Sequence, residues 1–103
     1  MDTLSNKALI LLDLLKKLGA VDVEHKTNVY KIMEKLQEVD LREILPDEPE
    51  FELESLMCEM TQKSISTTLA SLERKGFVIK TGVISTYVDE EKKNIRNYYL
   101  SQK

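Results

Sequence analysis

The side chains best suited to specific polar recognition lie in one stretch, residues 61–76 (TQKSISTTLASLERKG). Ile65, Leu69 and Leu72 recur at helical spacing and predict one apolar stripe. The opposite side carries hydroxyl, amide and cationic side chains: Gln62, Lys63, Ser66, Thr67 and Ser71. A helix that only faces water usually mixes Glu and Lys. Short donors and cations with almost no acid are instead typical of a helix that enters a DNA groove.

The neighbouring segments must hold this helix in place. Thr61 is suited to cap its start, and Gly76 is suited to end it in a left-handed conformation. Residues 50–60 predict a short amphipathic helix with Phe51 and four other apolar residues on its apolar face. Residues 77–88 and 95–101 predict two strands joined by the polar turn DEEKKN. Helix, turn, helix and two-stranded ribbon is the winged helix-turn-helix order.

These residues resemble a known family. The run 54–78, with Thr61 to Ser66 and then the pattern LERKGFV (72–78), resembles the DNA-binding core of MarR-type transcriptional regulators. Tyr99–Leu100–Ser101 resembles the end of the family's second wing strand. Two positions depart from the family pattern. Thr67 stands where the family often has a basic residue. The wing of the family usually carries an Asp-x-Arg pair. Here Asp89 is followed by two glutamates, and the nearest arginine is Arg96.

The predicted ribbon carries its own features. Gly82 predicts a bulge or bend in the first strand. Three tyrosines are expected to pack the ribbon against the helices: Tyr87, Tyr98 and Tyr99. Four basic residues are candidates for phosphate contacts: Lys80, Lys92, Lys93 and Arg96. Three acids share the tip of the ribbon and would repel a DNA backbone, so we expect contacts along its flanks.

Residues 4–18 predict an N-terminal helix that ends at Gly19. Its apolar residues cover more of its circumference than a core-facing stripe requires. The helix is therefore either buried on most sides within its own domain or part of a subunit interface. We favour the interface, because few elements remain to cover the helix. The predicted dimerisation residues are Leu4, Leu11, Leu12, Leu15 and Leu18.

The middle of the chain is expected to have a structural role and to contribute no binding or catalytic residue. Residues 20–26 are a polar connector, in which His25 is expected to be a solvated loop residue. Residues 27–39 predict a second helix, capped by Thr27 or Asn28, and a further turn follows around residues 41–45. The acidic loop PDEPE separates this part from the helix-turn-helix. Cys58 is expected to be a small buried hydrophobe.

At 103 residues the chain predicts a single domain, mainly α with a small β-ribbon. Residues 1–45 would form an N-terminal helical scaffold and dimerisation part, residues 50–76 the helix-turn-helix, and residues 77–101 the wing. The net charge of −3 is unevenly distributed. Residues 1–60 hold 7 basic and 14 acidic side chains, whereas residues 61–103 hold 8 basic and 4 acidic ones. A basic half beside an acidic half favours a polyanion-binding face, although chance patterning remains the alternative.

Two function hypotheses follow. The first is a homodimeric, sequence-specific double-stranded DNA-binding transcriptional regulator. Its DNA-binding residues would be Thr61, Gln62, Lys63, Ser64, Ser66, Thr67, Ser71, Lys80, Lys92, Lys93 and Arg96. The second is a winged-helix protein-protein interaction adaptor that does not bind DNA.

An enzyme is not indicated. The sequence has no Ser/His/Asp or Cys/His arrangement, no glycine-rich phosphate loop and no metal-ligand cluster, so no catalytic residue, metal or cofactor is expected. The apolar run at residues 8–15 is interrupted by Asp13 and has no cleavage site, so we expect neither a signal peptide nor a membrane partner. A single cysteine fits the reducing cytoplasm, where we place the protein.

Overall fold

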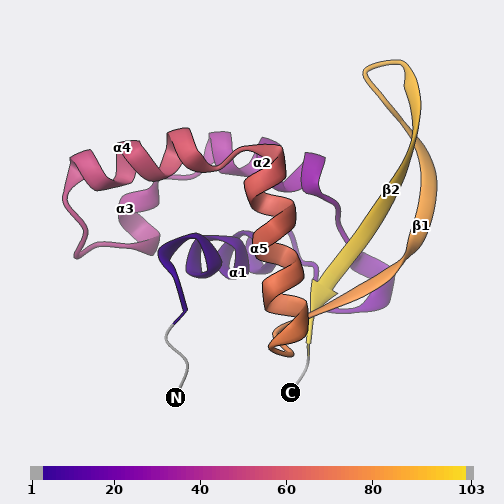
Figure 1. The fold of residues 1–103 in the computed structure, drawn as a ribbon, viewed down its shortest axis with the longest axis horizontal. Coiled ribbons are helices and arrows are strands. Elements are labelled where there is room, and N and C mark those ends of the chain that lie inside the picture. Colours follow the sequence, from indigo (N-terminus) through magenta and orange to yellow (C-terminus); the bar gives the residue numbers. More distant parts are fainter. Residues whose placement is uncertain (1–3, 102–103) are drawn as a thin grey trace.

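The computed structural model describes residues 4–101, which form a mixed α+β fold, as the sequence predicts (Figure 1). This part of the chain contains five α-helices, one short 3-10 helix and one antiparallel hairpin. The helices are α1 (Asn6–Lys17), η1 (Val23–His25), α2 (Val29–Glu38), α3 (Leu41–Ile44), α4 (Glu50–Glu59) and α5 (Gln62–Arg74). The strands are β1 (Val78–Val88) and β2 (Glu91–Leu100).

The core is made where α1, α2 and α5 pack on one another. The predicted stripe of α5, Ile65, Leu69 and Leu72, is buried there, so its face is confirmed. Helix α4 packs on α3, although only Met60 and Thr61 separate it from α5. Within the described residues, no helix is long and apolar enough to cross a membrane.

Polar side chains define where the helices begin. Ser5, Asn28 and Asp40 each accept a backbone N–H in the first turn of α1, α2 and α3. The Thr61 hydroxyl accepts from the Ser64 N–H at 3.2 Å, as predicted for the start of α5. Because the side chain at the cap bonds into the first turn, α1 and α2 each begin two residues later than the apolar pattern suggests.

Helix α5 ends in a glycine-dependent turn, as the sequence predicts. Gly76 has a φ of +85°, a conformation that glycine adopts at little cost. Its N–H donates to the Glu73 carbonyl at 3.1 Å, and the Phe77 N–H donates to the Leu72 carbonyl at 2.9 Å. This paired arrangement is a Schellman motif, which satisfies the last carbonyls of the helix and directs the chain into β1.

Helix α1 corrects part of the predicted dimer interface. Leu11 and Leu15 are 0% exposed and belong to the core of their own chain. They have no surface to offer a partner, so their assignment to a dimer interface is wrong. Leu4, Leu12 and Leu18 are only partly buried against that core and remain candidates. The helix has one face toward the core and a second, partly exposed apolar face, which explains its wide apolar surface.

The hairpin is longer and more tightly turned than the sequence suggests. Its turn is Asp89–Glu90 alone, with φ values of 50° and 68°, and β2 begins at Glu91. Two successive positive φ values are typical of a two-residue type I′ turn. Lys92 and Lys93 therefore lie in a strand rather than in a turn. The predicted irregularity at Gly82 is confirmed by a register shift between Lys80 and Val83.

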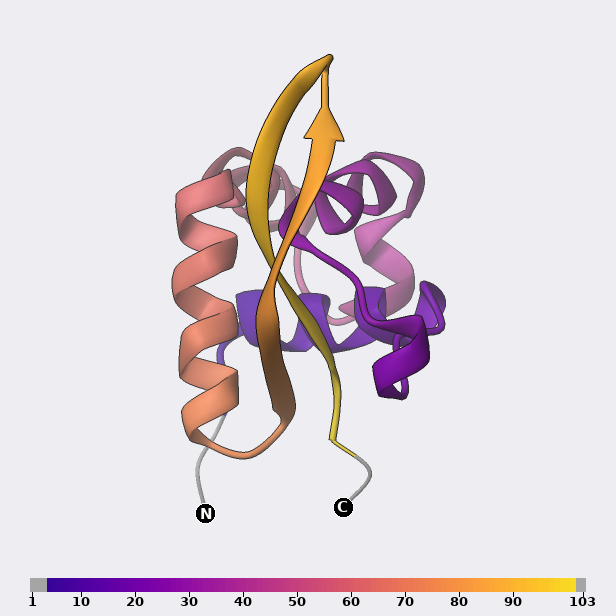
Figure 2. The same cartoon turned by 90° about the vertical axis from the view of Figure 1, so that its right-hand side faces the viewer.

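The hairpin base is joined to the helices by a third extended segment. The Thr27 N–H donates to the Tyr98 carbonyl at 2.8 Å, and the Tyr98 N–H donates to the Thr27 carbonyl at 2.7 Å. Thr27 is thus part of a β-bridge, and Asn28 is the residue that caps α2. Figure 2 shows the hairpin running between α5 and α2, with its turn projecting beyond the helices.

Three expected packing positions are wrong. Phe51 is 66% exposed, because Leu53 and Leu56 form the buried side of α4. Cys58 is exposed rather than buried. Tyr87 lies in the projecting part of the hairpin and is exposed, whereas Tyr98 and Tyr99 pack against the core as predicted. Periodicity alone does not reveal these faces, since short amphipathic elements admit more than one register.

Candidate nucleic-acid interface

A recess lies where the first turn of α5 meets α2 and β2. Its volume is about 170 Å³, and we call it the Tyr30 recess. The polar residues that line it are Tyr30, Gln62, Ser66, Lys93, Asn94, Arg96 and Tyr98. Four of these seven, Gln62, Ser66, Lys93 and Arg96, belong to the DNA-binding set predicted from sequence. The fold therefore brings two distant segments of that set to one place.

Backbone geometry determines this convergence. The Thr27–Tyr98 bridge places the start of α2 beside β2, and Tyr30 lies in the first turn of α2. The Thr61 cap then starts α5 at Gln62. The exposed N-terminal amides of a helix carry a partial positive charge, so this end of α5 is a favourable position for an anion.

Tyr30 links the two sides of the recess. Its hydroxyl accepts a hydrogen bond from the Gln62 side-chain amide at 3.3 Å. The Lys93 ammonium lies 5.6 Å from the centroid of the Tyr30 ring, within range of a cation–π interaction. Lys93 also lies 3.9 Å from the Glu91 carboxylate. The Tyr30 ring thus orders an amide that can hydrogen-bond a base edge and a cation that can bind a phosphate.

Burial raises the pKa of Tyr98, which lines the back of the recess. The guanidinium of Arg96 acts in the opposite direction but is the smaller effect. Since the ordinary pKa of tyrosine is already 10.0, the Tyr98 hydroxyl stays neutral at physiological pH. The positive charge of Lys93 and Arg96 at the recess is therefore not offset by this side chain.

Other predicted residues surround the recess at its exposed margin. Lys63 and Thr67 are exposed on α5 next to Gln62 and Ser66. Lys92 is exposed on β2, directly opposite Tyr87 in the register of the hairpin. Together with the recess residues they form a polar surface that carries cations from both α5 and β2.

The remaining predicted residues lie elsewhere or are used within the fold. Lys80 lies at the hairpin base, in a shallow hollow with Glu73 and Gly76 at the far end of α5. Ser71 is half-buried toward that same end. Thr61 and Ser64 bond to each other through the helix cap, which occupies the Thr61 hydroxyl as an acceptor. We therefore exclude Lys80 from the interface considered below.

Sequence reasoning missed Tyr30 and Asn94. The sequence around Tyr30 does not indicate a binding role. Its contacts are with Gln62 of α5 and Lys93 of β2, which lie far along the chain. Asn94 was expected in a turn, whereas in β2 its side-chain oxygen accepts from the Ser85 hydroxyl at 2.7 Å. The packing of α2 on α5 places Tyr30 beside Gln62, and the register of the hairpin places Asn94 in β2 opposite Ser85.

Acidic groups limit where a polyanion fits. Asp89 and Glu90 form the exposed hairpin turn, and Glu59 ends α4 with two residues between it and the start of α5. His25, which was expected in a loop, is the exposed last residue of η1, and its ring nitrogen Nδ1 is 2.7 Å from the Asp22 carboxylate. Among residues 4–101, no group of three or more His, Cys, Asp or Glu side chains could hold a metal ion.

Comparison with protein-family models, with curated proteins and with solved structures finds no match.

Proposed function

We propose that this chain is a winged helix-turn-helix protein, resembling MarR-type regulators, that binds double-stranded DNA and regulates transcription. The observation that carries the proposal is the Tyr30 recess. There Gln62 and Ser66 of α5 meet Lys93 and Arg96 of β2 at the N-terminal end of a helix whose outer side is polar. Amides and hydroxyls suit base edges, and the cations suit the adjacent phosphates.

In this proposal α5 enters the major groove with its N-terminal half. Lys63 and Thr67, both exposed, face the DNA together with Gln62 and Ser66. The buried stripe of α5 holds the helix against α1 and α2, so the reading side chains extend from a rigid support. Helices that read DNA from such a support contact only a few base pairs each, which favours a symmetric pair of subunits.

The hairpin acts as the wing. Lys92, Lys93 and Arg96 supply cations along its second strand, which would contact the DNA backbone beside the groove. The acidic turn at Asp89 and Glu90 would keep its tip away from the phosphates. The wing thus sets the register of the protein on DNA but reads little sequence.

The test is a pair of matched lysine truncations, measured by fluorescence anisotropy with labelled duplex DNA over a range of salt concentrations. Lys63→Ala should weaken binding and lower the slope of log affinity against log salt by about one. Lys80→Ala removes the same charge at the far end of α5 and should change neither quantity. An unchanged slope for Lys63→Ala, or an equal change for Lys80→Ala, would contradict the proposed interface.

A specific observation favours one alternative, a protein-protein interaction adaptor. Phe51 is 66% exposed on α4 and lies between Glu50 and Glu52, which suits a basic, apolar partner rather than DNA. The two functions give opposite results in the same assay. A regulator binds duplex DNA with steep salt dependence, whereas an adaptor shows no binding to duplex DNA at low salt.

A further inference from the structure

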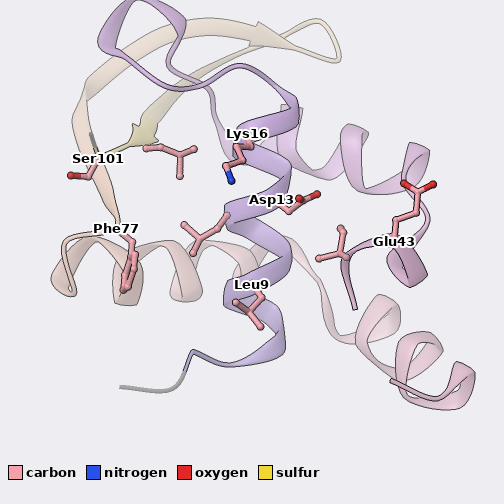
Figure 3. Close-up of a pocket in the computed structure, with 9 residues that line it drawn as sticks. Leu9, Asp13, Lys16, Glu43, Phe77 and Ser101 are labelled. Atoms are coloured by element: carbon pink, nitrogen blue, oxygen red, sulfur yellow. The ribbon is translucent and has the colours of Figure 1, made fainter. Parts of the chain in front are cut away.

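A groove lined by both apolar and charged side chains follows the exposed side of α1. Its volume is about 590 Å³, and we call it the α1 groove. The apolar residues that line it are Leu9, Leu12, Ile44, Phe77 and Leu100. Figure 3 shows Leu9 on α1 and Phe77 at the end of α5 bordering this hollow. None of the residues that line the α1 groove lines the Tyr30 recess.

The groove has both protruding and hollow parts. Leu9 and Phe77 are each 40% exposed, whereas Leu12, Ile44 and Leu100 are partly buried against the core. A face that contains apolar protrusions beside a hollow can pack against its own copy, because a two-fold axis brings each protrusion to the equivalent hollow. Exposed apolar surface of this kind usually marks association.

The charges of the groove also suit a second copy. Asp13 is neutralised by Lys17, whose ammonium lies 2.6 Å from its carboxylate. That leaves Lys16 and Glu43, one charge of each sign, and neither forms an ion pair within the described chain. Two copies facing each other across this groove therefore meet balanced charge.

Each of two other candidate surfaces has an excess of one sign of charge, although Arg42 lies near Glu50 and Glu91 lies near Lys93. The surface around Phe51 is flanked by Glu50, Glu52 and Glu54, so two copies would bring like charges together there. The cationic surface beside the Tyr30 recess would repel itself in the same way. The α1 groove is thus better suited to self-association than either of these two surfaces.

We propose that the α1 groove is the interface through which two copies of this chain form a symmetric dimer. This inference rests on the homodimer in the proposed function and names its surface. It replaces Leu11 and Leu15, which are buried within one chain, with Leu9 and Phe77. Because the groove and the Tyr30 recess share no residue, the dimer leaves both recesses free.

The test uses sedimentation velocity over a range of protein concentrations, with two charge-reversal variants. Lys16→Glu makes the groove net acidic and Glu43→Lys makes it net basic. Each variant alone should dimerise about tenfold more weakly than the unmodified protein, because like charges then face each other. An equimolar mixture should form heterodimers at close to the original affinity, because opposite charges are restored. Lys31→Glu, an exposed charge reversal outside the groove, should have no effect.

A second pair of variants tests the apolar contact. Leu9→Lys should prevent dimer formation, whereas Val23→Lys, at a side chain that is 51% exposed but outside the groove, should not. Circular dichroism confirms that each variant is folded. A monomeric unmodified protein, or a mixture that fails to recover, would overturn the inference and leave the groove to another partner. If the protein dimerises through this groove but does not bind DNA, the interface stands and the proposed function is refuted. If the protein is a monomer that binds DNA, the interface is refuted and DNA binding stands.

Discussion

Truncation of Leu69 to alanine should cost the protein a large part of its stability. Leu69 is 0% exposed, and its neighbours on the same stripe, Ile65 and Leu72, are buried as completely. The stripe packs against α1 and α2, whose core residues are themselves buried. Helices packed in this way move only slightly to fill a cavity. The loss of buried apolar surface and the cavity that remains therefore both lower the free energy of unfolding.

The expected loss is about 3–5 kcal/mol, in the upper part of the range for buried leucines. A domain of this size is typically stable by about 5–15 kcal/mol, so a loss of this size removes a large share of the stability and is easily measured. In urea denaturation, with a slope of about 1–3 kcal/mol per molar, the midpoint should fall by about 2 M. Both proteins must be measured at one concentration, since dimerisation adds to apparent stability.

Phe51→Ala is the control for this measurement. It removes a larger side chain, but one that is 66% exposed on α4, and should cost below about 1 kcal/mol. A loss below about 0.5 kcal/mol for Leu69→Ala would show that the core face of α5 is wrongly placed. An equal loss for the two variants would show that burial does not govern the stability of these helices.

Two further results are expected. Gly76→Ala should destabilise the protein by about 1–2 kcal/mol in the same urea assay, because a side chain at a φ of +85° is strained even though the added Cβ meets no neighbour. A neutral or stabilising effect would contradict this geometry. Hydrogen bonds from Arg42 lower the pKa of Asp40 below its ordinary value of 3.8. The contribution of Asp40 to stability is therefore complete above pH 3.8 and is lost as the pH falls through the lowered pKa. NMR titration should find that lowered midpoint and its return toward 3.8 in Arg42→Ala, and an unchanged midpoint would refute the pairing.

The helices were predictable where local signals agree. In α5 the cap at Thr61, the stripe through Leu69 and the glycine at residue 76 all specify the same helix, and the structure has it from Gln62 to Arg74. Hydrogen bonds at a cap and the spacing of apolar side chains act within a few residues, so the sequence contains the information directly.

The hairpin turn was harder to predict for a local reason. Asp89 and Glu90 both adopt positive φ without a glycine, so the usual signal for a two-residue turn is absent. The polar run after Val88 then resembles a long loop, although most of it is strand. Cross-strand pairing, such as that of Thr86 with Lys93, extends the strand through polar residues.

The Tyr30 recess and the face of α1 depend on contacts between distant segments. Tyr30 reaches Gln62 because α2 packs on α5, while the bridge of Thr27 with Tyr98 places the start of α2 beside the hairpin. The continuous apolar run of α1 does not distinguish the fully buried Leu11 from the half-exposed Leu9. Which of them faces the core is decided by the positions of α2 and α5, and a single sequence does not specify those positions.

The most direct test of the proposed function is the binding of the unmodified protein to random-sequence duplex DNA at two salt concentrations. Lys63, Lys92, Lys93 and Arg96 lie around the recess and the second strand of the hairpin. If they bind phosphates, the slope of log affinity against log salt should be about 3–4 per subunit, at about 0.9 per phosphate. Binding that weakens with that steepness is the predicted result. No binding at the lower salt concentration, or an affinity that does not change with salt, would contradict a DNA-binding role.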